Sequence, residues 1–286
     1  MINEPRAGQW ARLKEIVQRS GELVAVEDRT TWIHRNRVRL QGIAVLIVLD
    51  INTTLIRRFG GDLPARWSPS SIPWSPAIEA AFPDIRAEVV DYISRTTIPQ
   101  TAEVSGLDPD SEEGQHAAPA DRGRWRSLML ECFGNTIEEN ARHFPATLAA
   151  IKTAKGSTSI GFSALDPNSH IATHVGPNKG ALRYQMPIVT PGPPTSARIR
   201  IGPEMVPWSE GEPVVFDLSV NHEAWNDSDE TRVLLMFEIP LPLPAPLRWT
   251  NRFAQWTYRF HPSYIRLPER AREIAEVNNR LMAETA

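Results

Sequence analysis

The chain is poor in cysteine, with Cys132 as the single one among its 286 residues. One cysteine excludes an intrachain disulfide framework and a cysteine-based zinc site. The N-terminus lacks the basic and then apolar layout of a signal peptide. We therefore expect a cytoplasmic protein. At this length it can bury one large core, or one core with a helical annex.

The chain also lacks an excess of charge of either sign. Its 31 lysines and arginines are balanced by 34 acidic residues, which leaves a net charge of -3. This balance gives no electrostatic reason to expect binding of a nucleic-acid polymer. Long hydrophobic runs are missing as well: the longest covers residues 42–49, ends at Asp50 and is too short to cross a bilayer. We interpret it as a buried strand or helix and predict no membrane span.

Proline is abundant instead, with 25 residues whose density rises after residue 160. Because proline interrupts helices and marks turns and strand edges, the two halves of the chain should differ in structure. In the first half, apolar side chains at helical spacing predict helices over 10–17 and 85–93. A further helix is expected over 136–152, interrupted or divided by Pro145.

Residues 103–123 contain almost no apolar side chain and are rich in glycine, proline, aspartate and serine. Such a composition is typical of a long loop, which is either structureless or functional. We favour a structureless loop, in which His116 is the one residue of chemical interest.

After residue 160 the apolar period becomes two, as in 181–189, where apolar side chains alternate with Arg183 and Gln185. Similar short segments follow, separated by turn residues, at 197–202, 212–218 and 231–239. Closely spaced strands of this kind are typical of an all-β sandwich, jelly roll or barrel.

The C-terminal segment places three apolar residues on one helical face, namely Ile274, Val277 and Leu281. This spacing predicts a helix packed on the outside of the core. No segment repeats at a fixed period, and there is no glycine-rich phosphate loop. The chain thus reads as helices, then a β-barrel, then a closing helix.

His170 and His174 are four residues apart, which on a helix would form a metal clamp like that of zinc proteases. Pro167 precedes the pair, Gly176 and Pro177 follow it, and no glutamate stands between the histidines. These neighbours disfavour a helical clamp. A lone surface histidine is the simplest interpretation of either residue on its own.

A third histidine, His222, follows the strand predicted at 212–218. Two histidines, one entering a β-barrel and one on a late strand, are typical of a jelly-roll iron centre, usually with a carboxylate two residues after the first. Arg232 stands where the next predicted strand begins. A buried guanidinium can pair with the distal carboxylate of a 2-oxoacid through two parallel bonds. Arg232 is either that partner or a strand-edge charge, and beside the histidines we prefer the partner.

Three segments carry a family resemblance, namely HVGPNKGALRYQMPIVTP, WSEGEPVVFDLSVNHEAWND and TRVLLMFEI. They resemble the aspartyl/asparaginyl β-hydroxylase family of Fe(II)/2-oxoglutarate oxygenases, which has relatives among bacterial lipid A hydroxylases and amino-acid hydroxylases. Weaker matches are IPWSPAIEAAFPDIRAEV and RWRSLMLECFG. The resemblance covers roughly residues 60–243, and it leaves out residues 1–60 and the C-terminal helix.

The resemblance implies a mainly β fold with α-helices. Its core is a double-stranded β-helix (a jelly roll, cupin-like) with N-terminal helices and a C-terminal helix. We divide the chain accordingly into an N-terminal helical extension, a helical and loop part packed on the core, the double-stranded β-helix core, and a C-terminal segment with a helix, at residues 1–60, 61–155, 156–243 and 244–286.

The resemblance also implies residue roles. His174 and His222 match the ligands of Fe(II), which makes His170 an incidental neighbour. Arg232 matches the arginine that holds the distal carboxylate of 2-oxoglutarate, the cosubstrate that is consumed together with O2. Ser163 falls where the family places a hydroxyl group on the same cosubstrate.

Further positions depart from the family pattern. Arg183 matches an arginine of the active-site strand, but Gln185 stands where many members have histidine. Glutamine can still donate to a carboxylate, so the cosubstrate site is altered but kept. Ala181 replaces a basic residue of the peptide-hydroxylating members, which puts aspartyl peptides in doubt as substrates. Trp125, before the barrel, is either a core aromatic or a wall of the substrate pocket.

Gly176 lies two residues after His174, where a complete facial triad would have a carboxylate. The better-known hydroxylases of this family lack that carboxylate too, and the glycine leaves an open coordination position for water or for chloride. The resemblance implies hydroxylation of an unactivated C–H bond in a small molecule, an amino acid or a peptide-like substrate. A lipid A-like substrate is less favoured, because no membrane span is predicted.

Two alternatives remain open. One is an Fe(II)/2-oxoglutarate halogenase acting on a natural-product or nucleotide intermediate, for which the glycine would admit the halide. The other is a non-catalytic, cupin-like binding module. Arg232 and Ser163 favour catalysis, because a pure binding module has no reason to keep a clamp for the cosubstrate.

Overall fold

The strands form two antiparallel sheets. The larger has the order β1-β10-β7-β12-β5-β3-β4, and the smaller has the order β2-β6-β11-β8-β9. The computed structural model describes residues 32–105, 120–122, 124–176 and 178–285. Its strands are β1 (Arg66–Trp67), β2 (Ala120–Arg122), β3 (Trp125–Cys132), β4 (Asn135–Thr136), β5 (Ser159–Leu165), β6 (Ser169–His174), β7 (Ala181–Val189), β8 (Ala197–Ile201), β9 (Glu204–Pro207), β10 (Val214–Asp217), β11 (His222–Asn226) and β12 (Arg232–Pro240).

The order of these strands identifies the fold. From β5 onward the chain passes back and forth between the two sheets, with β5, β7, β10 and β12 in the larger one and β6, β8, β9 and β11 in the smaller one. This alternation winds the chain as a double-stranded β-helix, so the predicted jelly roll is confirmed. The strand predicted over 181–189 coincides with β7, and the three later predictions correspond to β8, β10 and β12.

The two faces of the larger sheet differ because side chains alternate along each strand. On β12, Leu235 and Phe237 point to the outer face and join a large apolar core. Arg232, Met236 and Glu238 occupy the other parity and point between the two sheets. The chemistry of the chain is therefore on the inner face, and the outer face supplies stability.

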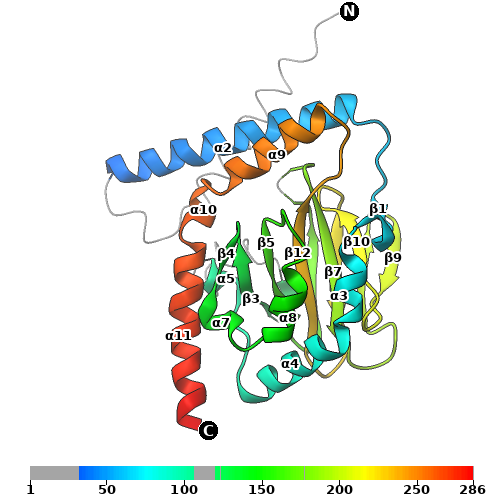
Figure 1. Ribbon diagram of the computed structural model, residues 1–286, viewed down its shortest axis with the longest axis vertical. Coiled ribbons are helices and arrows are strands. Elements are labelled where there is room, and N and C mark those ends of the chain that lie inside the picture. Colours follow the sequence, from blue (N-terminus) through cyan, green and yellow to red (C-terminus); the bar gives the residue numbers. More distant parts are fainter. Residues whose placement is uncertain (1–31, 106–119, 123, 177, 286) are drawn as a thin grey trace, which may run out of the picture.

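Helices cover the sheets on several sides. They are α2 (Trp32–Phe59), α3 (Ser75–Ala80), α4 (Phe82–Arg95), α5 (Thr101–Val104), α7 (Glu138–Ala141), α8 (Pro145–Ile151), α9 (Leu247–Tyr258), α10 (Pro262–Ile265) and α11 (Leu267–Thr285), with a 3-10 turn η2 (Pro69–Ser71). Figure 1 shows α3, α4 and α8 in front of the larger sheet. Helix α4 buries Ile85, Val89 and Tyr92 there, as its helical spacing predicts. Pro145 begins α8, which confirms that it divides the predicted helix.

Helix α2 contains the apolar run that the sequence left open between strand and helix. It extends far beyond that run and lies side by side with α9 across one end of the molecule (Figure 1). By length and composition alone, its stretch Leu40–Phe59 could cross a bilayer, and 33% of that stretch is buried in the fold. The run judged too short is thus the middle of a longer apolar helix.

The closing helix is confirmed as α11, but its buried face differs from the predicted one. Ala271, Ala275 and Met282 are buried, whereas Val277 and Leu281 are exposed. Of the predicted stripe, Ile274 is half-buried and packs against the core, and the small alanines beside it allow close packing of α11 against α7 and β3. The helix predicted over 10–17 and the loop residue His116 lie outside the described residues. The structureless loop predicted over 103–123 is wrong at its two described ends, where α5 extends to Val104 and Ala120–Arg122 forms β2, paired with β6.

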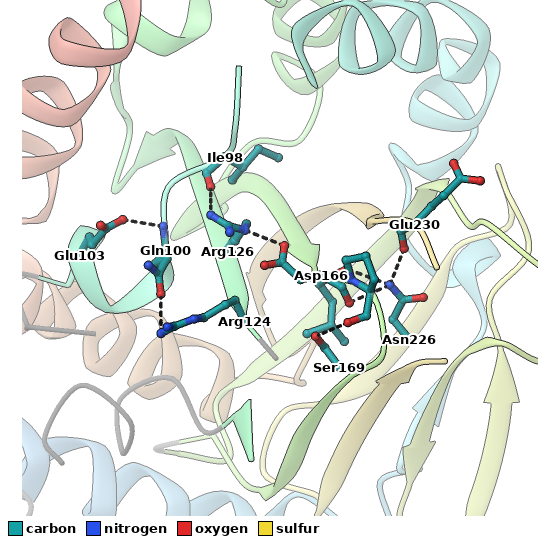
Figure 2. A network of polar contacts seen from close by, with 11 residues as sticks. Ile98, Gln100, Glu103, Arg124, Arg126, Asp166, Ser169, Asn226 and Glu230 are labelled. Carbon is teal, nitrogen blue, oxygen red and sulfur yellow. Dashed lines mark hydrogen bonds and ion pairs between the residues drawn. The ribbon is translucent and has the colours of Figure 1, made fainter. Parts of the chain in front are cut away.

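A polar network holds together the strand ends beside the inner face (Figure 2). The Asn226 amide donates to the carbonyl oxygens of Leu165, Asp166 and Glu230 at 2.9, 3.0 and 2.8 Å. The Asp166 carboxylate accepts from Arg126 Nε at 2.6 Å. These bonds join the ends of β3 and β5 to the turn that leads into β12, so they fix the place where Arg232 enters the barrel.

Candidate active site

The two predicted ligand histidines lie next to each other on the smaller sheet. His174 ends β6 and His222 begins β11, and the antiparallel register pairs them directly. Their ring centroids are 4.2 Å apart. Side chains opposite each other on adjacent strands share one face of the sheet, so the register itself brings the imidazoles together.

Backbone hydrogen bonds fix the tautomer of both imidazoles. Nδ1 of His174 lies 2.8 Å from the Ala172 carbonyl oxygen, and Nδ1 of His222 lies 2.8 Å from that of Val220. A carbonyl oxygen can only accept, so each Nδ1 carries the hydrogen and each Nε2 keeps its lone pair. Burial lowers the pKa of His174, and burial together with His174 lowers the pKa of His222 to about 3. Both rings are therefore neutral at neutral pH, which is the form that binds a metal.

Among the described residues, His174 and His222 are the two candidate metal ligands that meet at this place. Within the described residues, no group of three or more His, Cys, Asp or Glu side chains could hold a metal ion. His170, the other histidine of β6, stacks on Trp225 with ring centroids 4.8 Å apart, and its Nε2 lies 3.3 Å from Glu223. These contacts take it away from the His174–His222 pair.

Close packing explains why Gly176 has no side chain. Its amide donates to the Leu218 carbonyl oxygen at 2.7 Å. A Cβ at this position would lie 2.4 Å from Cγ of Leu218 and 2.9 Å from that same oxygen. Even alanine would collide with the neighbouring strand end, so a carboxylate here would require Leu218 to move. Whether a halide binds beside this glycine stays a prediction.

Arg232 is a buried cation without a carboxylate partner among the described residues. Its side chain is 1% exposed, and its guanidinium lies 4.6 Å from the centre of the Trp208 ring. Nη1 is 3.4 Å from the Ser163 carbonyl oxygen, and Nε has no hydrogen-bond partner in the described part of the chain. Burial lowers the pKa of Arg232 to about 9, so the group is still charged at neutral pH. A buried charge left unpaired is costly, which fits a site for an anionic group.

Ser163 and Trp125 connect this arginine to the histidines. The Ser163 hydroxyl on β5 accepts from Nε1 of Trp125 on β3 at 3.0 Å. The Trp125 ring is 6.4 Å from the His174 ring, centroid to centroid. Trp125 also lines the cavity described below, so it is a wall of the pocket that contacts the edge of the barrel core.

Arg183 and Gln185 lie on the inner face of β7, as their parity predicts. Nη1 of Arg183 and Nε2 of Gln185 both contact the Met236 sulfur at 3.7 Å. Arg183 Nε and Gln185 Oε1 are buried without hydrogen-bond partners in the described residues. Together with Arg232 they give the inner face several polar atoms available to a polar ligand.

A cavity of about 270 Å³ opens beside these residues. It runs from β3, β5, β7 and β12 to helices α5, α9, α10 and α11, and much of its wall is apolar or aromatic. Residues that line it include Met129, Arg183, Met236, Tyr258, Tyr264 and Leu267. Helices α9 to α11 lie outside the segments that carried the family resemblance, so sequence comparison could not have placed them at the site.

Glu238 is a cavity residue that sequence reasoning missed. It is buried, accepts from the Ser159 hydroxyl at 3.3 Å and lies 4.0 Å from an Nη2 of Arg183. A signal was present, because Glu238 shares the parity of Arg232 on the predicted strand and is the acidic residue of that face. Its carboxylate partly balances Arg183, whereas Arg232 has no acidic partner in the part of the chain that the structure describes.

Comparison with known proteins decides the family. The model of the aspartyl/asparaginyl beta-hydroxylase family matches residues 79–242, which is more than half of the chain. This chain belongs to that family. The match contains the histidine pair, Arg232, Ser163 and both polar residues of β7, so the family resemblance is confirmed.

Individual relatives of this hydroxylase family differ in how much they share with the chain. The ornithine lipid ester-linked acyl 2-hydroxylase of Rhizobium tropici is 32% identical over 188 residues, covering 66% of this chain and 64% of that protein. Human aspartyl/asparaginyl beta-hydroxylase is 27% identical over 131 residues, covering 44% of this chain and 17% of that protein. The chain thus spans less than two thirds of the length of these relatives.

Among solved structures, a Pseudomonas putida prolyl-4-hydroxylase matches with a TM-score of 0.34 and 13% identity, covering 69% of this chain and 99% of the other. The jelly-roll assignment rests on the strand order of this chain itself. Family membership, for its part, favours a hydroxylase over a non-catalytic binding module.

Proposed function

We propose that this chain is an Fe(II)- and 2-oxoglutarate-dependent hydroxylase. The observation that carries the proposal is the buried Arg232, which has no acidic partner among the described residues, on the inner face of the larger sheet, together with a pair of neutral imidazoles on the smaller sheet. An arginine in this position matches an anionic cosubstrate, and the imidazole pair matches a divalent iron ion.

His174 and His222 would hold the iron through their Nε2 atoms. Imidazole is a ligand that suits Fe(II), and iron centres with few protein ligands leave positions for cosubstrate and dioxygen. The Nδ1 bonds to the Ala172 and Val220 carbonyls orient each ring and fix its tautomer before any metal arrives. The residues present therefore fit a two-histidine iron site.

Arg232 would hold the distal carboxylate of 2-oxoglutarate. The ring of Trp208 supports the guanidinium from one side, which keeps the fork in one orientation. The Ser163 hydroxyl accepts from Trp125, so its own hydrogen remains to be donated to the same carboxylate. Gln185 Oε1 and Nε2 give a further polar contact on the neighbouring strand.

When bound, iron and 2-oxoglutarate supply the oxidative chemistry, in which dioxygen is consumed, the cosubstrate is decarboxylated to succinate and a C–H bond is hydroxylated. The residues of the chain orient the cosubstrate and exclude water from the inner face. Trp125 stands between Ser163 and His174 and closes that side of the pocket.

The substrate that we propose carries an apolar chain. Much of the wall of the cavity is apolar, with Met129, Met236 and Leu267 among its lining residues, and its charged groups Arg183 and Glu238 lie 4.0 Å apart, so they partly balance each other. The Rhizobium tropici relative acts, by its name, on an ester-linked acyl group. The cavity thus changes the order of preference reached from sequence, in which a lipid substrate came last.

The test is iron-dependent formation of succinate from 2-oxoglutarate by the full chain. We expect turnover with added Fe(II), its loss in His174→Ala and in His222→Ala, and its retention in His170→Ala, which is the matched control on the same strand. Thermal melting should stay close to that of the wild type, because the apolar strands carry the stability. Turnover that survives His222→Ala, or that needs His170, would refute the ligand assignment.

A further inference from the structure

One face of α9 exposes large aromatic side chains. Trp249, Phe253, Trp256 and Phe260, just past the helix end, are 41% to 59% exposed. They follow the helical period, and neighbouring rings touch, with centroids 5.9 Å apart for Phe253–Trp256 and 5.0 Å for Trp256–Phe260. A soluble surface seldom keeps contiguous exposed aromatics without a partner.

Helix α2 continues this surface. Leu40, Ile51 and Phe59 are 55% to 66% exposed. We call these three residues, together with the four aromatics at α9, the aromatic face. Figure 1 shows the two helices side by side at one end of the molecule, so the residues of the aromatic face come from two neighbouring helices.

Contacts along its length keep α2 on the domain. The Gln41 amide donates to the Phe260 carbonyl oxygen at 2.8 Å. The Asn52 amide donates to Asn251 Oδ1 at 2.9 Å. These two hydrogen bonds, made by Gln41 and Asn52, hold α2 along the surface of the domain. To cross a bilayer, α2 would have to break them and separate from α9. A helix parallel to the domain surface is instead suited to the plane of a membrane interface.

The charge of this region points to the chemistry of its partner. Residues 32–59 and 247–266 contain nine arginines and a single acidic residue, Asp50, although the chain as a whole carries -3. Arg57, Arg58, Arg248 and Arg252 are exposed beside the aromatic face. Arginines bordering exposed tryptophan and phenylalanine are the pattern of an interfacial helix on an anionic lipid surface.

We propose that the aromatic face docks on an anionic lipid bilayer, with α2 and α9 lying in its interface. Two copies of the chain joined through this face would bring the same arginines together, which disfavours a symmetric dimer. Helix α9 also turns Tyr258 inward to the cavity while Trp256 points outward. An acyl chain leaving the bilayer would therefore pass along one helix to the cavity, a step that rests on the proposed function.

The experiment is co-sedimentation of the full chain with vesicles of phosphatidylcholine alone and of phosphatidylcholine with phosphatidylglycerol. It needs neither iron nor 2-oxoglutarate, so its failure is distinct from failure of the proposed hydroxylase. We expect binding to the anionic vesicles that weakens as salt is raised. The triple variant Trp249→Ala/Phe253→Ala/Trp256→Ala should lower the partition coefficient by more than about tenfold.

The matched control is Met205→Ala/Val277→Ala, which removes exposed apolar side chains elsewhere on the molecule. It should bind vesicles like the wild type. A second variant, Arg248→Gln/Arg252→Gln, should lose the preference for anionic vesicles while keeping the aromatic residues. The proposal is overturned if the wild type binds neither vesicle. It is also overturned if the triple variant binds anionic vesicles as strongly as the wild type does. The same holds if the three substitutions only convert a dimer into monomers.

Discussion

At the scale of single residues, Arg232 is the residue that links the sequence motif to the proposed binding of the cosubstrate. The sequence places it at the start of a strand, and beside the two histidines a cosubstrate partner is preferred over a strand-edge charge. The structure buries it on the inner face against Trp208. Burial of this kind depends on where β9 and the following loop fold back, and no local pattern around Arg232 contains that information.

Replacing Arg232 by Ala should weaken 2-oxoglutarate binding more than a hundredfold. Removing one partner of a buried charge pair costs about 3–5 kcal/mol, and each factor of ten corresponds to about 1.4 kcal/mol. Arg232→Lys should rescue only part of the loss, since an ammonium group cannot form two parallel bonds. Calorimetric titration with iron present measures the dissociation constant.

The matched control is Arg198→Ala, because Arg198 also lies over a tryptophan ring, that of Trp225, but away from the inner face. It should leave 2-oxoglutarate binding unchanged. Equal affinity in the wild type and in Arg232→Ala would remove this arginine from the cosubstrate site.

Gly176 gives a second prediction at this scale. Gly176→Ala should lower the free energy of unfolding by about 1–3 kcal/mol, because the new Cβ would overlap Leu218 in a packed region. Gly42→Ala in α2 is the control, since its Cβ would meet nothing closer than 3.4 Å and alanine favours a helix. Denaturant unfolding of both variants measures the difference. An unaffected Gly176→Ala protein would mean that the two segments can separate freely here.

At the scale of elements, the strands of the core could be predicted from sequence and the C-terminal helices only in part. The alternation of apolar side chains at every second position predicted β7 with the bounds that the structure shows. Helix α9 was missed because its hydrophobic pattern is inverted: Trp249 and Phe253 face outward, while the polar Asn251 and Gln255 are buried. A search for an apolar buried stripe does not find such a helix. In α11 the prediction failed for another reason, because the small Ala271 and Ala275 are buried while the larger Val277 and Leu281 are exposed.

Those buried polar residues are what holds α9 in place. Asn251 is 1% exposed, donates to the Gly180 carbonyl oxygen at 2.9 Å and accepts from Asn52 of α2. Asn178 Oδ1 accepts from Gln255 Nε2 at 2.8 Å and from the Gly180 amide at 2.6 Å. This cluster ties α2 and α9 to the loop between β6 and β7, a few residues after His174.

Asn251→Ala should therefore lower the free energy of unfolding by about 1–3 kcal/mol, because it leaves buried polar partners without hydrogen bonds. We also expect faster amide hydrogen exchange in α2 and α9 than in the core strands. Thr250→Ala is the control, since Thr250 is exposed and its hydroxyl bonds only within the helix, to the Leu247 carbonyl. If the two substitutions were equally harmless, the cluster would not be what anchors the helices.

At the scale of the whole molecule, the jelly roll and the helical layer have different roles. The barrel brings residues distant in sequence, such as Ser163, His222 and Arg232, to the space between its two sheets. The helices beyond the family match close the far side of the cavity, and α9 together with α2 carries an arginine-rich surface on an otherwise slightly acidic chain. Sequence motifs could predict the first part, since the family shares them. The second part depends on how this chain packs its own helices.

The most direct measurement of the central claim is an anaerobic calorimetric titration of the full chain with 2-oxoglutarate, with and without Fe(II). We expect tight binding that requires both the metal and the His174–His222 pair, so that His174→Ala loses it and His170→Ala retains it. Binding of 2-oxoglutarate that is equally tight without iron, or that is unchanged in His174→Ala, would contradict the account.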